Sequence, residues 1–312
     1  MEKTLDDVHE QKIDFMSNNE LFRILREREC CLTELSVLQD FIDRRDVINV
    51  YAGEELISFV VPKHRSMDQA LEIKISENEE ELLNEYIVSN LLYNYGFTTE
   101  VLDYFSSNKD YLIMEYVPKK SALEEFDSIE KMATGMASAL REFHNIKIPK
   151  DSLSPEECEI LVRDPHKYMD VALANEEGNS AFKDYIKQIN YSTVKDYIID
   201  NGHLFKVCDV IVHGNFSPAN VFIKDGKLDK ITNFSESHYG DRHFDIYYAM
   251  YTSAYYLGIL DDELLLEKFN NLFLDSYGRD NIDYERLRLC GNIICMYFDQ
   301  NTYKKNLTRI RF

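Results

Sequence analysis

The residues most able to do chemistry lie between positions 213 and 245, in a fixed order. His213 is followed by Asn215 and Asn220, and after an Asp-Gly turn come Asn233 and Asp245. Phosphoryl transfer to a hydroxyl uses a carboxylate that accepts the hydroxyl proton, an Asn that binds a metal, and a second carboxylate that holds Mg²⁺ against the phosphates. The segment has the spacing of such a site, with amides where the two carboxylates are expected.

The two amides change what the segment can do. Asn215 has nearly the size of Asp but takes up no proton at ordinary pH. Asn233 offers Mg²⁺ a carbonyl oxygen without negative charge, although Mg²⁺ prefers charged oxygen ligands. Asn220 keeps its usual chemistry as a metal ligand. The pattern therefore predicts the shape of a phosphoryl-transfer site with a substituted base and a weakened metal position.

The segment resembles the aminoglycoside phosphotransferase and choline kinase family, whose signature is H-G-D-x-x-x-x-N, a hairpin, an I-D-F-like strand end and G-D-x-x-x-D. The matching residues are His213, Gly214, Asn215 and Asn220, then ITNF at 231–234 and GDRHFD at 240–245. The resemblance implies an α+β, bilobal protein-kinase-like fold, with a small antiparallel-sheet N-lobe and a mostly helical C-lobe. It also implies that Asp245 opens a helix and holds the loop at His213 through backbone hydrogen bonds.

Upstream residues complete the pattern. The stretch 71–75 alternates apolar and charged residues as a half-buried strand does, with Lys74 on the opposite side from its apolar neighbours. Ser76 and Glu79 form a capping box for a helix that contains Glu85. Kinases pair a strand Lys with a helix Glu to grip the α- and β-phosphates. We therefore expect Lys74 and Glu85 to pair; the alternative is a surface Lys and one Glu among many.

Two further segments fit an N-lobe. Strands at 47–51 and 56–61 are joined by Ala-Gly-Glu-Glu, a turn whose carboxylates disfavour phosphate. The stretch YLIMEYV at 111–117 predicts the last strand of the lobe. The resemblance implies that the backbone from Glu115 to Val117 binds adenine, whereas the pattern alone indicates only a buried strand.

Length and composition bound the architecture. The chain has 312 residues and 45% apolar content, enough for a large core. We expect a helical extension at 1–44, an N-lobe at 45–117, and at 118–312 a helical C-lobe with the catalytic-type loop. The extension could pack on the N-lobe, mediate dimerisation or bind a partner, and a structural role is the expected one.

The net charge of −21 restricts the partners. It argues against nucleic acid, whose phosphates need Lys and Arg, and it suits a cationic small molecule. No apolar run is long enough to span a membrane, and the acidic N-terminus lacks a signal-peptide core. The six Cys residues contain no C-x-x-C and indicate neither a zinc site nor a disulfide framework. The sequence predicts a cytoplasmic protein without a membrane partner.

Two functions remain open. The first is a pseudokinase with a degraded catalytic site that binds a small molecule, a nucleotide or a protein partner. The alternative is an active ATP- or GTP-dependent phosphotransferase that acts on a hydroxyl of a cationic small molecule, aminoglycoside-like or choline-like. In that case Asp241 or Glu236 would supply the missing charge. Mg²⁺ and ATP or GTP are the expected cofactors if nucleotide binding is retained, and otherwise none is expected.

Overall fold

The computed structural model describes residues 18–27, 30, 38, 48–52, 56–63, 66–77, 79–117, 120–148, 153–161, 194–204 and 210–297. The turn at 53–55, most of the extension and the last fifteen residues lie outside these ranges. The chain divides into two compact units, residues 2–119 and 120–312. None of the described helices combines the length and apolar character that a bilayer crossing requires.

The first unit is built on a five-stranded antiparallel sheet with the order β1-β2-β3-β5-β4. Its strands are β1 (Ile48–Ala52), β2 (Leu56–Lys63), β3 (Ser66–Ser76), β4 (Val101–Ser106) and β5 (Asp110–Glu115). Strand β3 is central and pairs with β2 and β5, which places Lys74 in the middle of the sheet. This sheet confirms the predicted antiparallel small lobe.

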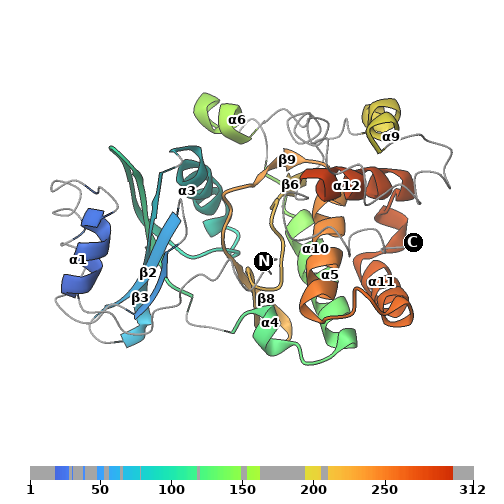
Figure 1. The fold of residues 1–312 in the computed structure, drawn as a ribbon, viewed down its shortest axis with the longest axis horizontal. Coiled ribbons are helices and arrows are strands. Elements are labelled where there is room, and N and C mark those ends of the chain that lie inside the picture. The colour runs from blue at the N-terminus through green and yellow to red at the C-terminus, as the bar shows by residue number, and fades with distance from the viewer. Residues whose placement is uncertain are drawn as a thin grey trace, which may run out of the picture. The chain divides into compact units, whose positions relative to one another are not determined.

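Each face of the sheet is covered by a helix (Figure 1). Helix α1 (Asn18–Glu27) buries Leu21 and Leu25 in one core with Ile73 and Ile75 of β3. Helix α3 (Glu79–Tyr93) lies on the other face, where its Leu82 belongs to a second apolar cluster with residues of β5. The described part of the N-terminal extension therefore packs on the sheet of the first unit.

The predicted capping box at Ser76 is wrong. Ser76 is the last residue of β3, where it pairs with Leu56 and Asp110, and α3 begins at Glu79. The Ser76 hydroxyl donates a hydrogen bond to the Glu81 carboxylate at 3.0 Å. The backbone of Ser76 continues the strand ladder, so this residue ends a strand and does not cap the helix.

The second unit is mostly helical. The helices among its described residues are α4 (Ala122–Glu125), α5 (Ile129–His144), α6 (Pro155–Leu161), α9 (Val194–Asn201), α10 (Arg242–Tyr256), α11 (Glu263–Tyr277) and α12 (Tyr284–Tyr297), with 3-10 turns η4 (Gly202–Leu204) and η5 (Arg279–Asn281). Helix α5 packs against α10 and α11, and α10 also packs against α12. The amphipathic pattern of α5 buries Met132, Met136, Leu140 and Phe143. The helical lobe matches the predicted fold class.

Two short antiparallel ribbons carry the loops of this unit. Strand β6 (Val210–Val212) pairs with β9 (His238–Gly240), and β7 (Val221–Lys224) pairs with β8 (Lys227–Ile231). The β7–β8 turn has Asp225 and Gly226 at φ of 52° and 74°, as a tight hairpin turn requires. The hairpin after the catalytic-type loop is therefore present where the sequence predicted it.

Helix α10 begins earlier than expected. It starts at Arg242, and the Asp241 side chain caps it by accepting the backbone N–H of His243 at 2.9 Å. Asp245 lies inside the first turn, fully buried. The expectation that Asp245 opens the helix is corrected, because Asp241 provides the N-cap four residues earlier.

Candidate functional site

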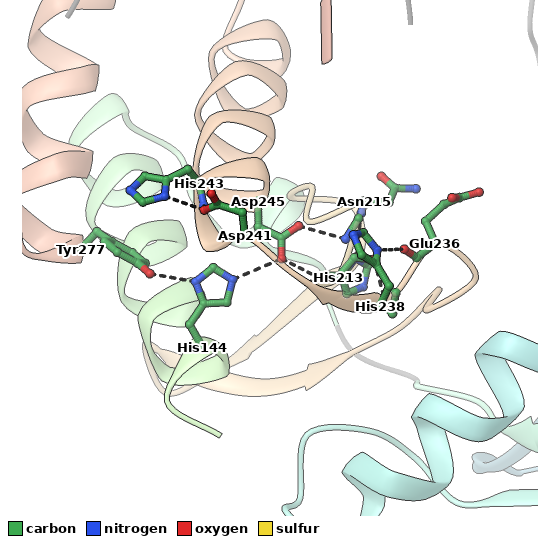
Figure 2. Close-up of polar contacts among 11 residues, drawn as sticks. His144, His213, Asn215, Glu236, His238, Asp241, His243, Asp245 and Tyr277 are labelled. Atoms are coloured by element: carbon green, nitrogen blue, oxygen red, sulfur yellow. Dashed lines mark hydrogen bonds and ion pairs between the residues drawn. The ribbon is translucent and has the colours of Figure 1, made fainter. Parts of the chain in front are cut away.

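The loop that follows β6 is fixed by one buried carboxylate. Asp245 accepts the backbone N–H of His213 at 2.6 Å and that of Gly214 at 2.9 Å, one on each oxygen (Figure 2). Hydrogen bonds to a charged acceptor are among the stronger ones, and a buried N–H without an acceptor is costly. The conformation of the loop therefore depends on Asp245.

A second layer lies behind Asp245. His144, at the end of α5, places Nε2 3.3 Å from the Asp245 carboxylate. Its other nitrogen, Nδ1, lies 2.8 Å from the hydroxyl of Tyr277 at the end of α11 (Figure 2). All three side chains are buried. No pattern in the sequence marks Tyr277 as a partner of His144, from which it is 133 residues away along the chain.

His213 ties the loop to the segment that contains Asn233. The Asn215 N–H donates to His213 Nδ1 at 3.1 Å, so the ring proton is on Nε2, which donates to the Thr232 carbonyl at 3.0 Å. Burial lowers the pKa of His213, an effect larger than the opposing attraction of Asp245. Both ring nitrogens are engaged within the protein, so His213 is a neutral positioning group and not a proton acceptor for substrate.

Asn215 and Asn220 lie in this loop, and both are partly buried. Asn220 donates its side-chain N–H to the Asn215 carbonyl at 3.0 Å, which leaves its amide oxygen as the atom that could bind a metal. Gly214 has a φ of +80°, and a Cβ there would lie 2.6 Å from the Glu236 carbonyl oxygen. Only glycine fits this approach, which brings the loop against the segment at Glu236.

Asn233 has a φ of +66°, in the left-handed region that Asn tolerates better than most residues. Its amide oxygen already accepts a hydrogen bond from Ser235 at 3.3 Å. The two expected metal ligands, Asn220 and Asn233, are therefore both uncharged. The described residues also contain no group of three or more His, Cys, Asp or Glu arranged to hold a metal ion. This donor set fits Mg²⁺ poorly.

Two other carboxylates could make up the lost charge, and they differ. One oxygen of Asp241 binds His243, with Nδ1 at 2.6 Å, and the other binds Arg286, with Nε at 2.8 Å. Burial would raise the pKa of Asp241, but these contacts outweigh it and the pKa is lowered. Asp241 is thus committed to the α10–α12 packing, whereas Glu236 is only half-buried and lies beside Gly214. Arg286 was not singled out from the sequence.

In the first unit, the Lys74 ammonium lies 2.7 Å from the Glu85 carboxylate, and both side chains are buried. Burial alone would lower the pKa of Lys74. The attraction of Glu85, reinforced by Glu72 and Glu81, is stronger in sum, and the pKa lies above its ordinary value. The structure therefore joins a strand ammonium to a helix carboxylate, as the sequence order predicted.

The predicted adenine-binding stretch lies at the end of β5. Glu115 is exposed, and Val117 is buried. The N–H of Glu115 donates to the Glu100 carbonyl and that of Tyr116 to the Ala70 carbonyl, both at 2.9 Å. These two N–H groups are engaged within the unit. Adenine binding by the backbone from Glu115 to Val117 stays a prediction.

Comparisons with known proteins agree with this geometry. Residues 72–290 match the model of the phosphotransferase enzyme family. A relative, the probable aminoglycoside 3'-phosphotransferase of Lactococcus lactis subsp. lactis (strain IL1403), is 24% identical over 189 residues. That match covers 59% of this chain and 66% of the relative, just under two thirds of its length.

Solved structures show the same kinase-like fold. Spectinomycin phosphotransferase APH(9)-Ia, in complex with ADP and spectinomycin, has a TM-score of 0.57 at 13% identity and covers 85% of each chain. The streptomycin–ATP complex of APH(2")-IIa has a TM-score of 0.57 at 15% identity, over 87% of this chain and 92% of the other. Plasmodium vivax ethanolamine kinase has a TM-score of 0.52 at 19% identity, over 80% and 71%. By its family match, its fold and its loop geometry, the chain belongs to the phosphotransferase enzyme family.

Proposed function

We propose that this protein is a pseudokinase of the phosphotransferase family, which binds a ligand but transfers phosphoryl groups poorly or not at all. The observation that carries the proposal is the pair of amides at Asn215 and Asn233. Both lie at the positions where the family pattern has carboxylates. Asn215 is in the loop that Asp245 holds, and Asn233 is in the segment that His213 ties to that loop.

The expected effects of the two amides on the rate of phosphoryl transfer favour loss of activity. A positioned general base typically contributes about 10²–10⁴ in rate, which Asn215 cannot supply. Phosphoryl transfer also depends on electrostatic stabilisation of the transferring group, so the missing charge at Asn233 adds a second loss. Together the two substitutions remove proton acceptance and most of the attraction for a metal.

The retained frame supports ligand binding. The groups that we assign to a nucleotide-class ligand, with ATP or GTP as the family's examples, are Lys74, Glu85 and the backbone from Glu115 to Val117. Because Asn220 and Asn233 are uncharged, Mg²⁺ adds little to this binding. The net charge of −21 favours a cationic second ligand, in line with relatives solved with spectinomycin and streptomycin. We place the protein in the cytoplasm; a protein partner is a further possible ligand.

One observation favours the alternative, an active phosphotransferase that uses ATP or GTP and a cationic alcohol. The half-buried Glu236 lies where Gly214 lets the two loops approach closely. These contacts are made by the backbone carbonyl and the Cβ of Glu236, and its carboxylate is the one that we would test as a replacement for the charge missing at Asn215. Asp241 is excluded from that role because both of its oxygens are engaged.

Reversion of the two amides tests the proposal. We would titrate Asn215→Asp, Asn233→Asp and the double variant with ATP and GTP, each with and without Mg²⁺, by calorimetry. Asn233→Asp should make nucleotide binding Mg²⁺-dependent, because it returns a charge to the metal position. Asn215→Asp should leave binding unchanged and raise turnover, because a base acts only in the transfer step.

The matched control is Asn271→Asp on α11, an exposed amide that accepts a hydrogen bond from Arg279. It makes the same chemical change away from the site and should alter neither binding nor metal dependence. If the double variant shows no more Mg²⁺-dependent binding than the wild type, then nucleotide binding is lost elsewhere. The protein would then be an interaction scaffold and not a nucleotide-binding pseudokinase.

A further inference from the structure

One face of the first unit's sheet carries more negative charge than is expected of a site that binds phosphate groups. Side chains alternate along a strand, so Glu72, Lys74 and Ser76 of β3 share the face toward α3, opposite the Ile73 face. Ser58 of β2 pairs directly across from Lys74 on the same face. On β2 and β3 this face therefore presents one ammonium among hydroxyls and carboxylates, beside the apolar Leu112 and Met114 of β5.

Three carboxylates act on that ammonium. Glu85 contacts it at 2.7 Å, and Glu72 and Glu81 both contribute attraction. Glu81 lies four residues before Glu85, one turn away on the same side of α3. The formal charge of the group is one positive against three negative, whereas a kinase Lys–Glu pair is neutral.

The two additional carboxylates are held in place. Ser58 donates its hydroxyl to Glu72 at 2.8 Å, and Ser76 donates to Glu81 at 3.0 Å. Ser58 is directly across from Lys74, and Ser76 is two residues beyond it on the same face. These bonds hold both carboxylates on the face that carries Lys74.

We propose that Glu72 and Glu81 abolish phosphate recognition at Lys74, so that the first unit takes a nucleoside-class ligand without phosphate groups. The inference rests on the proposed retention of ligand binding and specifies its chemistry. Lys74 alone would attract a triphosphate, but an anion near it meets a surplus of fixed negative charge. The base and sugar then provide the affinity, and the phosphates add none.

The test compares adenosine, ATP and inorganic tripolyphosphate, titrated without Mg²⁺ into the full chain and into Glu72→Gln/Glu81→Gln. Glutamine keeps an acceptor for Ser58 and Ser76, so the fold is preserved and thermal unfolding serves as the check. The wild type should bind adenosine at least as tightly as ATP and should not bind tripolyphosphate. The double variant should gain about tenfold in ATP affinity for each carboxylate removed, with adenosine unchanged. Glu27→Gln, an exposed carboxylate on α1 at the other face of the sheet, is the control and should change nothing.

Several results would overturn the inference. The first is wild-type ATP affinity ten times or more above that for adenosine; the second is a double variant that gains no affinity for ATP or tripolyphosphate. Failure of the wild type to bind adenosine at all would refute the nucleoside assignment. Phosphate-dependent affinity without turnover would overturn this inference while the pseudokinase proposal stands, so the two can be told apart.

Discussion

Replacement of Asp245 by Ala should be among the most destabilising single changes in the second unit. The side chain is fully buried and accepts two backbone N–H groups, at 2.6 and 2.9 Å. Its removal leaves both N–H groups buried without an acceptor, at about 1–3 kcal/mol each. The nearby His144 also loses its carboxylate neighbour. We expect a total loss of about 3–5 kcal/mol in the free energy of unfolding.

The assay is urea unfolding of the full chain, with Asp262→Ala as the matched control. Asp262 also accepts a backbone N–H, from Leu265 at 3.0 Å, but it is an exposed N-cap worth about 1 kcal/mol. Asp245→Asn is the milder variant in case the Ala variant does not fold, and its cost should lie between the other two. If Asp245→Ala unfolds at the same urea concentration as Asp262→Ala, then the carboxylate does not hold the loop.

Three further predictions concern stability and use the same unfolding measurement. Lys74→Met should lower the free energy of unfolding by about 3–5 kcal/mol, because the buried Glu85 carboxylate loses its counter-charge. The double variant Lys74→Met/Glu85→Leu should recover most of that stability. If Lys74→Met is as stable as the wild type, the buried ion pair is refuted. The pKa of His213 is lowered in the folded chain, so below about pH 6.5 the unfolded chain binds a proton that the folded chain does not. The free energy of unfolding should therefore fall as the pH is lowered from 7 to 5. In His213→Gln it should fall less steeply. Equal slopes would contradict the neutral assignment. Gly291→Ala should cost about 1–3 kcal/mol, because its Cβ would lie 2.3 Å from the Tyr247 ring, and a neutral effect would show that the ring can move.

Local pattern was enough to predict the elements that carry the site. The alternation at 71–75 gave the strand and the face of Lys74, and the spacing from His213 to Asn233 gave a loop, a hairpin and a second loop. Such features depend on residues close in sequence, where the period of side chains and the chemistry of turns decide the outcome. The kinase-like fold was implied by the resemblance of these motifs to the aminoglycoside phosphotransferase and choline kinase family.

Contacts between distant segments were not predictable in the same way. Nothing local to Tyr277 marks it as the partner of His144, and nothing local to Arg286 marks it as the partner of Asp241. The start of α10 was misplaced at Asp245, which the structure shows to be buried against the loop, while Asp241 caps the helix. These contacts and the start of α10 depend on tertiary packing, which the local periodicity of a single sequence does not reveal.

The measurement that tests the central claim most directly is a product assay for phosphoryl transfer by the wild-type chain. Purified protein would be incubated with ATP or GTP, Mg²⁺, and kanamycin, choline or ethanolamine, with phosphorylated product detected by mass spectrometry beside nucleotide hydrolysis. Asn215→Asp/Asn233→Asp provides the comparison. The account predicts product near background for the wild type and a Mg²⁺-dependent gain in the double variant. Robust turnover by the wild type would contradict the account and point to Glu236 as the carboxylate that replaces the missing charge.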